Sequence, residues 1–116
     1  MINLQRIYDP PGPADGHRVL VDRLWPRGVR KEAARIDAWL RELAPGDGLR
    51  RWYGHDPARW PLFRQRYWGE LKGKGDLLAL LKDGTEERPV TFVYAASDEE
   101  RNSAVALKEL LERGKR

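Results

Sequence analysis

The chain has 116 residues, which suits one domain with a single core and is too short for two cores of ordinary size. Hydrophobic residues make up 41% of it, and the eleven aromatic side chains include five Trp, a composition that excludes a disordered chain. The absence of cysteine excludes disulfides, thiolate metal sites and cysteine nucleophiles. We therefore expect residues 1–116 to form one domain.

The formal net charge of +4 is concentrated in two segments. The first basic segment, residues 17–35, holds six Arg or Lys and two acidic residues, and the second, residues 50–66, holds five and one. They form one positive face if the fold brings them together, and two separate solvated faces if it does not. No apolar run approaches the roughly 20 residues that span a bilayer, so we expect a cytoplasmic protein without membrane contact.

Residues 2–8 alternate in polarity like a strand, and the Pro- and Gly-rich residues after them predict a surface loop. A second strand is predicted in "RVLVDR", because Val19, Leu20 and Val21 are apolar on both faces, as in a strand covered on two sides. The turn "WPRG" follows, and Pro26 disfavours a direct continuation as helix.

Helical spacing of apolar residues predicts a helix over residues 32–43. A short helical turn is expected at 49–53, followed by a helix that begins with Asp56 as its cap and Pro57 in its first turn. The apolar stripe of that helix contains Trp60, Phe63, Tyr67 and Leu71. A further helix is predicted from a cap at Asp76 to a stop at Gly84.

"PVTFVYAA", residues 89–96, is the clearest strand. Ser97 and Glu100 match a capping box, which predicts a last helix over residues 98–113 with Ala104, Leu107 and Leu111 facing inward. Strands separated by helices indicate an α/β fold: a single layered domain with a small, at least partly parallel sheet of three or four strands flanked by helices.

Common nucleotide, zinc-protease and serine-hydrolase motifs are absent. Because His17 and His55 are the only histidines, a metal site would need carboxylates such as Asp22 or Asp56, and we predict no metal and no cofactor.

Ligands of parallel sheets bind beyond the carboxyl ends of the strands, which selects residues 22–27 and 94–98. Arg23 and Arg27 suit phosphate or carboxylate groups, Trp25 offers a stacking wall, and Asp22 is a candidate general base or polar anchor. Asn102 lies where it could reach the strand ends or tie helix to loop.

An alternative needs no ligand. Asp98, Glu99 and Glu100 crowd the expected helix start, and they could pair with Arg23 or Arg27 across adjacent loops. Both interpretations hold if the two arginines divide the roles.

His55 is the natural general acid or base, since its usual pKa lies near neutrality and it falls in a turn. The simpler interpretation is that His55 merely precedes the capping residue. Trp25, Trp52 and Trp68 fall outside the helical stripes, and an exposed aromatic ring beside Arg is typical of nucleic-acid or peptide contacts.

The segments "DGHRVLVDRLWPRG", "LRRWYGHDPARWPLFRQRYWGEL" and "TFVYAASDEERNSAVAL" together resemble the bacterial YeaO-like proteins, a family of unknown function, from about Leu4 to Leu111. The resemblance implies a small cytosolic α/β protein and no particular activity. The residues that match the family's motifs are Asp22, Arg23, Trp25, Pro26, Arg27, Gly28, Tyr94, Ala95, Ala96 and Asn102.

Three functions follow as hypotheses. The leading one is binding of a small anionic or phosphate-bearing ligand at the carboxyl edge of the sheet, by Asp22, Arg23, Trp25, Arg27, Tyr94 and Asn102. The second is a non-catalytic nucleic-acid-binding module that uses the two basic segments. The third is a small hydrolase or transferase with His55 and Asp22 as catalytic residues. The sequence leaves the oligomeric state open.

Overall fold

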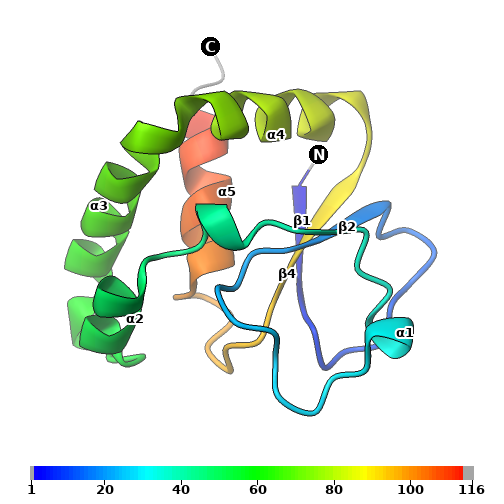
Figure 1. Ribbon diagram of the computed structural model, residues 1–116, viewed down its shortest axis with the longest axis horizontal. Helices are drawn as coiled ribbons and strands as arrows, with labels where there is room; N and C mark the ends of the chain where they lie inside the picture. The colour runs from blue at the N-terminus through cyan, green and yellow to red at the C-terminus, as the bar shows by residue number, and fades with distance from the viewer. Residues whose placement is uncertain (1, 114–116) are drawn as a thin grey trace.

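Four strands form one parallel sheet in a computed structural model that describes residues 2–113 (Figure 1). The strands are β1 (Ile2–Arg6), β2 (His17–Leu20), β3 (Ala38–Trp39) and β4 (Val90–Tyr94), and they lie in the order β1-β4-β2-β3. Every pairing is parallel. The predicted α/β class is therefore confirmed, with a sheet that is parallel throughout.

Both faces of the sheet are covered, and the alternation of side chains along the strands decides which residue meets which cover. Val19, Val21 and Phe92 belong to the larger apolar cluster, whereas Leu20 and Val93 belong to the smaller one. All five are at most 2% exposed. A strand with two buried faces was the prediction for Val19 to Val21, and it is confirmed.

The larger face is covered by helices, which Figure 1 shows beside and above the sheet. The helices of this layer are α2 (Asp47–Tyr53), α3 (Trp60–Leu71), α4 (Gly75–Glu87) and α5 (Ser103–Arg113), with short 3-10 turns at Arg41–Leu43, Pro57–Arg59 and Lys72–Lys74. The smaller face is covered by the segment after β2, which contains the single turn α1 (Lys31–Ala34). None of the described helices is long and apolar enough to cross a membrane.

The helix predicted over residues 32–43 is wrong. Arg35 adopts a left-handed conformation (φ 50°) that ends α1, and the chain then pairs with β2 as β3. The Leu40 N–H donates to the Leu20 carbonyl at 2.9 Å, and the Trp39 indole donates to the Asp22 carbonyl at 2.7 Å. Hydrogen bonds to the sheet thus outweigh the helical spacing of the apolar residues.

Three further helix boundaries differ from the predictions. The helix α4 begins at Gly75, so Asp76 lies in its first turn and is not its cap, and the helix continues through Gly84 to Glu87. The last helix begins at Ser103 rather than near Asp98, because the Asn102 Oδ1 accepts the Val105 N–H at 2.9 Å and so acts as the cap. The Asp98 carboxylate instead accepts the N–H groups of Glu100 and Arg101 within the preceding loop.

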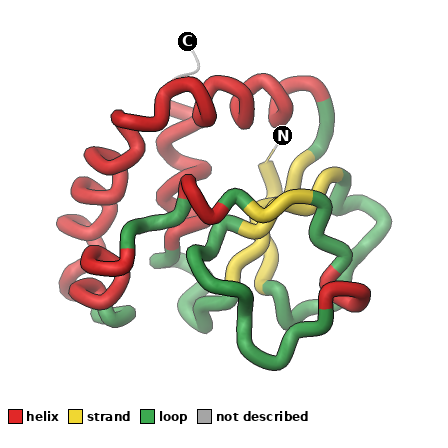
Figure 2. Tube along the Cα trace, in the orientation of Figure 1, coloured by secondary structure: helices red, strands yellow, loops and turns green. Residues whose placement is uncertain are grey.

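The connection from β1 to β2 is a loop closed against the start of β4. Gly16 has φ +66°, and a Cβ there would lie 2.2 Å from the Pro89 carbonyl oxygen, so only glycine fits. At the other end of the strands, loops drawn in green run along the lower edge of Figure 2. The loops that follow β2 and β4 line one cavity together with the end of α2. That carboxyl edge carries the candidate site.

Candidate functional site at the carboxyl edge of the sheet

A cavity of about 480 Å³ opens at the carboxyl edge of the sheet. Three segments supply most of its lining: residues 22–27 after β2, residues 95–96 with 102–103 around the start of α5, and residues 50–51 with 53–55 at the end of α2. Pro45 and Phe63 complete it. Segments far apart in the sequence therefore meet where the strand-end rule places ligands.

Asp22 ties the two strand ends together at this cavity. Its Oδ2 accepts the Ala95 N–H at 2.8 Å, and its carbonyl oxygen accepts the Trp39 indole. Burial raises the pKa of Asp22 to about 6, although the Ala95 hydrogen bond and the charges of His55 and Arg50 act in the opposite direction. Within the described chain, the Oδ1 atom has no hydrogen-bond partner.

Trp25 is held in one orientation. Its indole donates to the Val29 carbonyl at 2.8 Å, and its ring meets the ring of Trp39 edge-on, with centroids 5.5 Å apart. The turn closes at Gly28, whose φ of +77° suits glycine. Trp25 therefore presents a fixed aromatic surface to the cavity, next to Leu24, whose side chain is 60% exposed.

Four arginines line the cavity, two from each basic segment: Arg23 and Arg27 from the first, and Arg50 and Arg51 from the second. The Asp47 carboxylate is shared, since its Oδ1 lies 3.7 Å from the Arg23 Nε and 3.5 Å from an Arg50 nitrogen. The Arg51 Nε donates to the Asp47 carbonyl at 3.3 Å.

The guanidinium of Arg27 engages no ion pair, hydrogen bond or aromatic ring of residues 2–113. Four guanidiniums thus stand against two carboxylates, Asp22 and Asp47.

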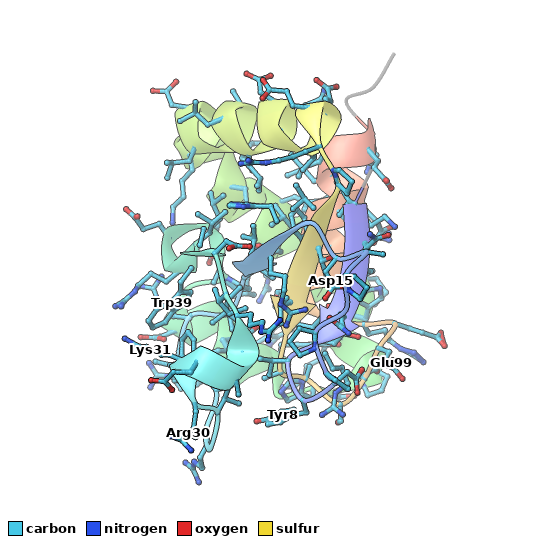
Figure 3. All side chains as sticks on the ribbon, turned by 90° about the vertical axis from the view of Figure 1, so that its right-hand side faces the viewer. Tyr8, Asp15, Arg30, Lys31, Trp39 and Glu99 are labelled. Carbon is cyan, nitrogen blue, oxygen red and sulfur yellow. The ribbon has the colours of Figure 1, made fainter. Side chains whose placement is uncertain are left out.

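The alternative in which Asp98, Glu99 or Glu100 neutralises Arg23 or Arg27 is absent among the described residues. Asp98 pairs with Arg101 of its own loop at 3.8 Å, and hydrogen bonds to backbone N–H groups lower its pKa. In Figure 3, Glu99 lies on the opposite side of the view from Arg30, the residue that precedes α1. Because α5 begins later than predicted, the acidic residues lie in a loop of their own, Arg23 pairs with Asp47, and Arg27 has no acidic partner among the described residues.

His55 also lines the cavity, in a left-handed conformation (φ 57°) that follows the left-handed Gly54. Left-handed backbone is uncommon for residues other than glycine. The His55 ring lies 6.0 Å from that of Tyr53. Asp56 caps the next turn by accepting the Ala58 N–H at 3.0 Å, as predicted. His55 thus lines the cavity and also precedes the capping residue, and its role as acid or base stays a prediction.

Two predicted site residues have structural roles. Asn102 is 3% exposed, caps α5 with its Oδ1 and donates from Nδ2 to the Asp98 carbonyl at 2.9 Å. Tyr94 is buried beneath the cavity rather than in its lining, and burial raises its pKa, with the charge of Glu99 adding to the effect. The polar groups of Asn102 are already engaged, so it supports the wall that a ligand would touch.

The sequence interpretation missed Arg50, Arg51 and Leu24 as lining residues, although the second basic segment contains both arginines. His17 lies elsewhere, at the start of β2, with its Nδ1 3.7 Å from Asp37. Within residues 2–113, no three His, Cys, Asp or Glu side chains lie together in a way that could hold a metal ion.

Comparison with known proteins identifies relatives along almost the whole chain. Residues 1–115 match a family described as "Inactive DUF488-N3 subclade". The uncharacterized protein YeaO of Escherichia coli is 36% identical over 110 residues, which cover 95% of this chain and 96% of YeaO. An uncharacterized protein of Mycobacterium tuberculosis is 41% identical over 110 residues, which cover 95% of this chain and 92% of that protein. No solved structure matches significantly.

Proposed function

This chain belongs to the inactive DUF488-N3 subclade, and we propose that it binds a small phosphate- or carboxylate-bearing molecule in the carboxyl-edge cavity without transforming it. The observation that carries the proposal is the surplus of guanidinium groups around one cavity. Arg27 has no acidic partner among residues 2–113, and Arg23 and Arg50 share Asp47. Guanidinium groups with unused donors suit bidentate recognition of phosphate or carboxylate.

The site is also partly organised before a ligand arrives. The hydrogen bond from Ala95 to Asp22 fixes the distance between the two loops, and the Trp25 ring is locked by Val29 and Trp39. A preformed site loses less conformational entropy on binding than a flexible one. The word "inactive" in the family description favours binding over catalysis.

Nucleic-acid binding receives less support from the surface aromatics. Arg59 and Arg66 both lie over the Trp52 ring, and Arg64 and Arg113 both lie over the Trp68 ring. Rings already occupied by guanidiniums of the same chain are poor platforms for bases.

Titration with inorganic pyrophosphate, followed by calorimetry and by amide NMR shifts, tests the proposal. We expect binding at low salt, with shifts at Ala95 and Ala96. Arg27→Gln should weaken binding about tenfold or more, as expected for the loss of one charged hydrogen bond. Arg30→Gln is the matched control, because Arg30 is an exposed arginine of the same basic segment but lies outside the cavity lining.

Absence of binding, or equal losses in both variants, would overturn the small-ligand proposal. Equal losses together with steep weakening by salt would favour the nucleic-acid alternative.

One observation supports a second candidate, the hydrolase or transferase. His55 and Asp22, two titratable side chains, line the same cavity. Turnover of p-nitrophenyl phosphate with a pH dependence near neutrality that disappears in His55→Ala would establish this candidate in place of simple binding.

A further inference from the structure

The arginines account for an anionic group of the ligand, but they leave the Asp22 carboxylate unexplained. Its Oδ2 is used by Ala95, while Oδ1 has no partner in the described chain and the residue lines the cavity. A bare anion has no donor to offer an acceptor in that position. A ligand that also donates to this oxygen carries a hydroxyl or amino group as well as its anionic group.

The remaining wall is apolar. Leu24 and Trp25 line it from the loop after β2, and Tyr53 and Phe63 line it as a stacked pair with ring centroids 4.3 Å apart. An exposed Leu beside a fixed indole offers a flat apolar surface. Such a surface suits an aromatic ring better than a small inorganic ion.

The dimensions agree with a ligand larger than phosphate. A cavity of about 480 Å³ lies within the range of roughly 300–1,000 Å³ that is typical of small-molecule sites. A nucleotide combines all three features: its phosphate is the anionic end, its sugar hydroxyls donate hydrogen bonds, and its base is the flat ring.

We propose that the ligand is a nucleoside monophosphate, with its phosphate on the cavity arginines, its base on the Leu24–Trp25 surface and a hydroxyl or amino group donating to Asp22. This inference rests on the proposed function, since the phosphate end occupies the anion site. It adds two requirements, an aromatic base and a donor, that anion binding alone does not have.

Calorimetric titration with AMP, CMP, ribose 5-phosphate, adenosine and inorganic phosphate separates these requirements. We expect AMP or CMP to bind at least tenfold more tightly than ribose 5-phosphate, and ribose 5-phosphate more tightly than phosphate. Nucleotides that bind no better than phosphate would overturn the inference while leaving the anion site standing. If none of the phosphate-bearing probes binds, the proposed function fails as well.

Three variants assign the contacts. Trp25→Leu should weaken AMP binding about tenfold and leave phosphate binding unchanged, and Leu24→Ser should weaken AMP binding less, without a risk to folding because Leu24 is 60% exposed. Asp22→Asn should weaken AMP and ribose 5-phosphate, but not phosphate. Leu80→Ser is the control, because Leu80 is 70% exposed on α4 and outside this cavity. Equal weakening of AMP and phosphate in Trp25→Leu and Leu24→Ser would contradict the aromatic contact.

Discussion

The two ends of β2 both carry arginine, but in opposite environments. At its start, Arg18 is 3% exposed and neutralised: one nitrogen lies 2.6 Å from the Asp15 carboxylate and 2.5 Å from Gln5, and the Nε donates to the Ala34 carbonyl at 3.1 Å. Beyond its other end, Arg27 is exposed and its guanidinium has no partner among residues 2–113.

The difference separates a structural arginine from one that is available to a ligand. The bonds of Arg18 hold the loop before β2 against the sheet, and the Thr91 hydroxyl adds a hydrogen bond to the Asp15 carbonyl at 2.7 Å. Burial of a guanidinium is tolerated only with such partners. Arg27 retains its hydration and its hydrogen-bond donors. Its replacement should therefore weaken ligand binding and leave the free energy of unfolding almost unchanged.

The largest loss of stability is therefore expected on replacement of Arg18, at the start of β2. Arg18→Met should lower the free energy of unfolding by about 3–5 kcal/mol, because it leaves the Asp15 carboxylate without its partner. Urea denaturation followed by circular dichroism measures this loss. The double variant Arg18→Met with Asp15→Asn should lose less than the single variant, since it no longer contains an unpaired carboxylate. A loss below about 1 kcal/mol in the single variant would remove the contrast between the two ends.

Much of the fold follows from the sequence because it depends on local pattern. The pattern of Val19 to Val21 correctly predicts a strand with two covered faces, and the stripe that includes Phe63 and Tyr67 correctly predicts core residues. The prediction for the segment after α1 was wrong, because the pairing of Trp39 with Leu20 is a tertiary contact that no local pattern reveals.

For the same reason, the sequence predicts only part of the candidate site. Asp22, Arg23, Trp25 and Arg27 are contiguous and follow a strand, so the strand-end rule finds them. Arg50 and Arg51 approach the same cavity only through the packing of α2. The pairing expected with Asp98 failed because Asn102, rather than Ser97, caps α5.

The effect of intermediate size on stability is expected at Asp22. Burial raises its pKa from 3.8 to about 6, so the folded state holds the proton more tightly than the unfolded state does. The contribution of Asp22 to stability is therefore lost as the pH rises from about 4 to about 6, by up to about 3 kcal/mol. Asp22→Asn keeps an oxygen for the Ala95 N–H, so it should be closest in stability to the parent chain at pH 4 and increasingly more stable than the parent up to pH 7.5.

Unfolding free energies of the parent chain and of Asp22→Asn between pH 4 and 8 measure this difference. The exposed Asp83→Asn on α4 serves as the control and should follow the parent curve. If Asp22→Asn also follows the parent curve, the carboxyl group is solvated well enough to be an ordinary surface acid. Water would then have more access to the Asp22 carboxylate than its hydrogen bond with the Ala95 N–H indicates.

The smallest effect on stability is expected at Arg27. Its guanidinium has no described partner, and only its backbone carbonyl is used, by the Tyr8 hydroxyl at 3.3 Å. Arg27→Gln should therefore change the free energy of unfolding by less than about 0.5 kcal/mol. Arg23→Gln should cost slightly more, because it gives up the exposed pair with Asp47. A loss above about 1 kcal/mol in Arg27→Gln would mean that this arginine, like Arg18, supports the fold, and a binding defect in the same variant could then no longer be assigned to the ligand.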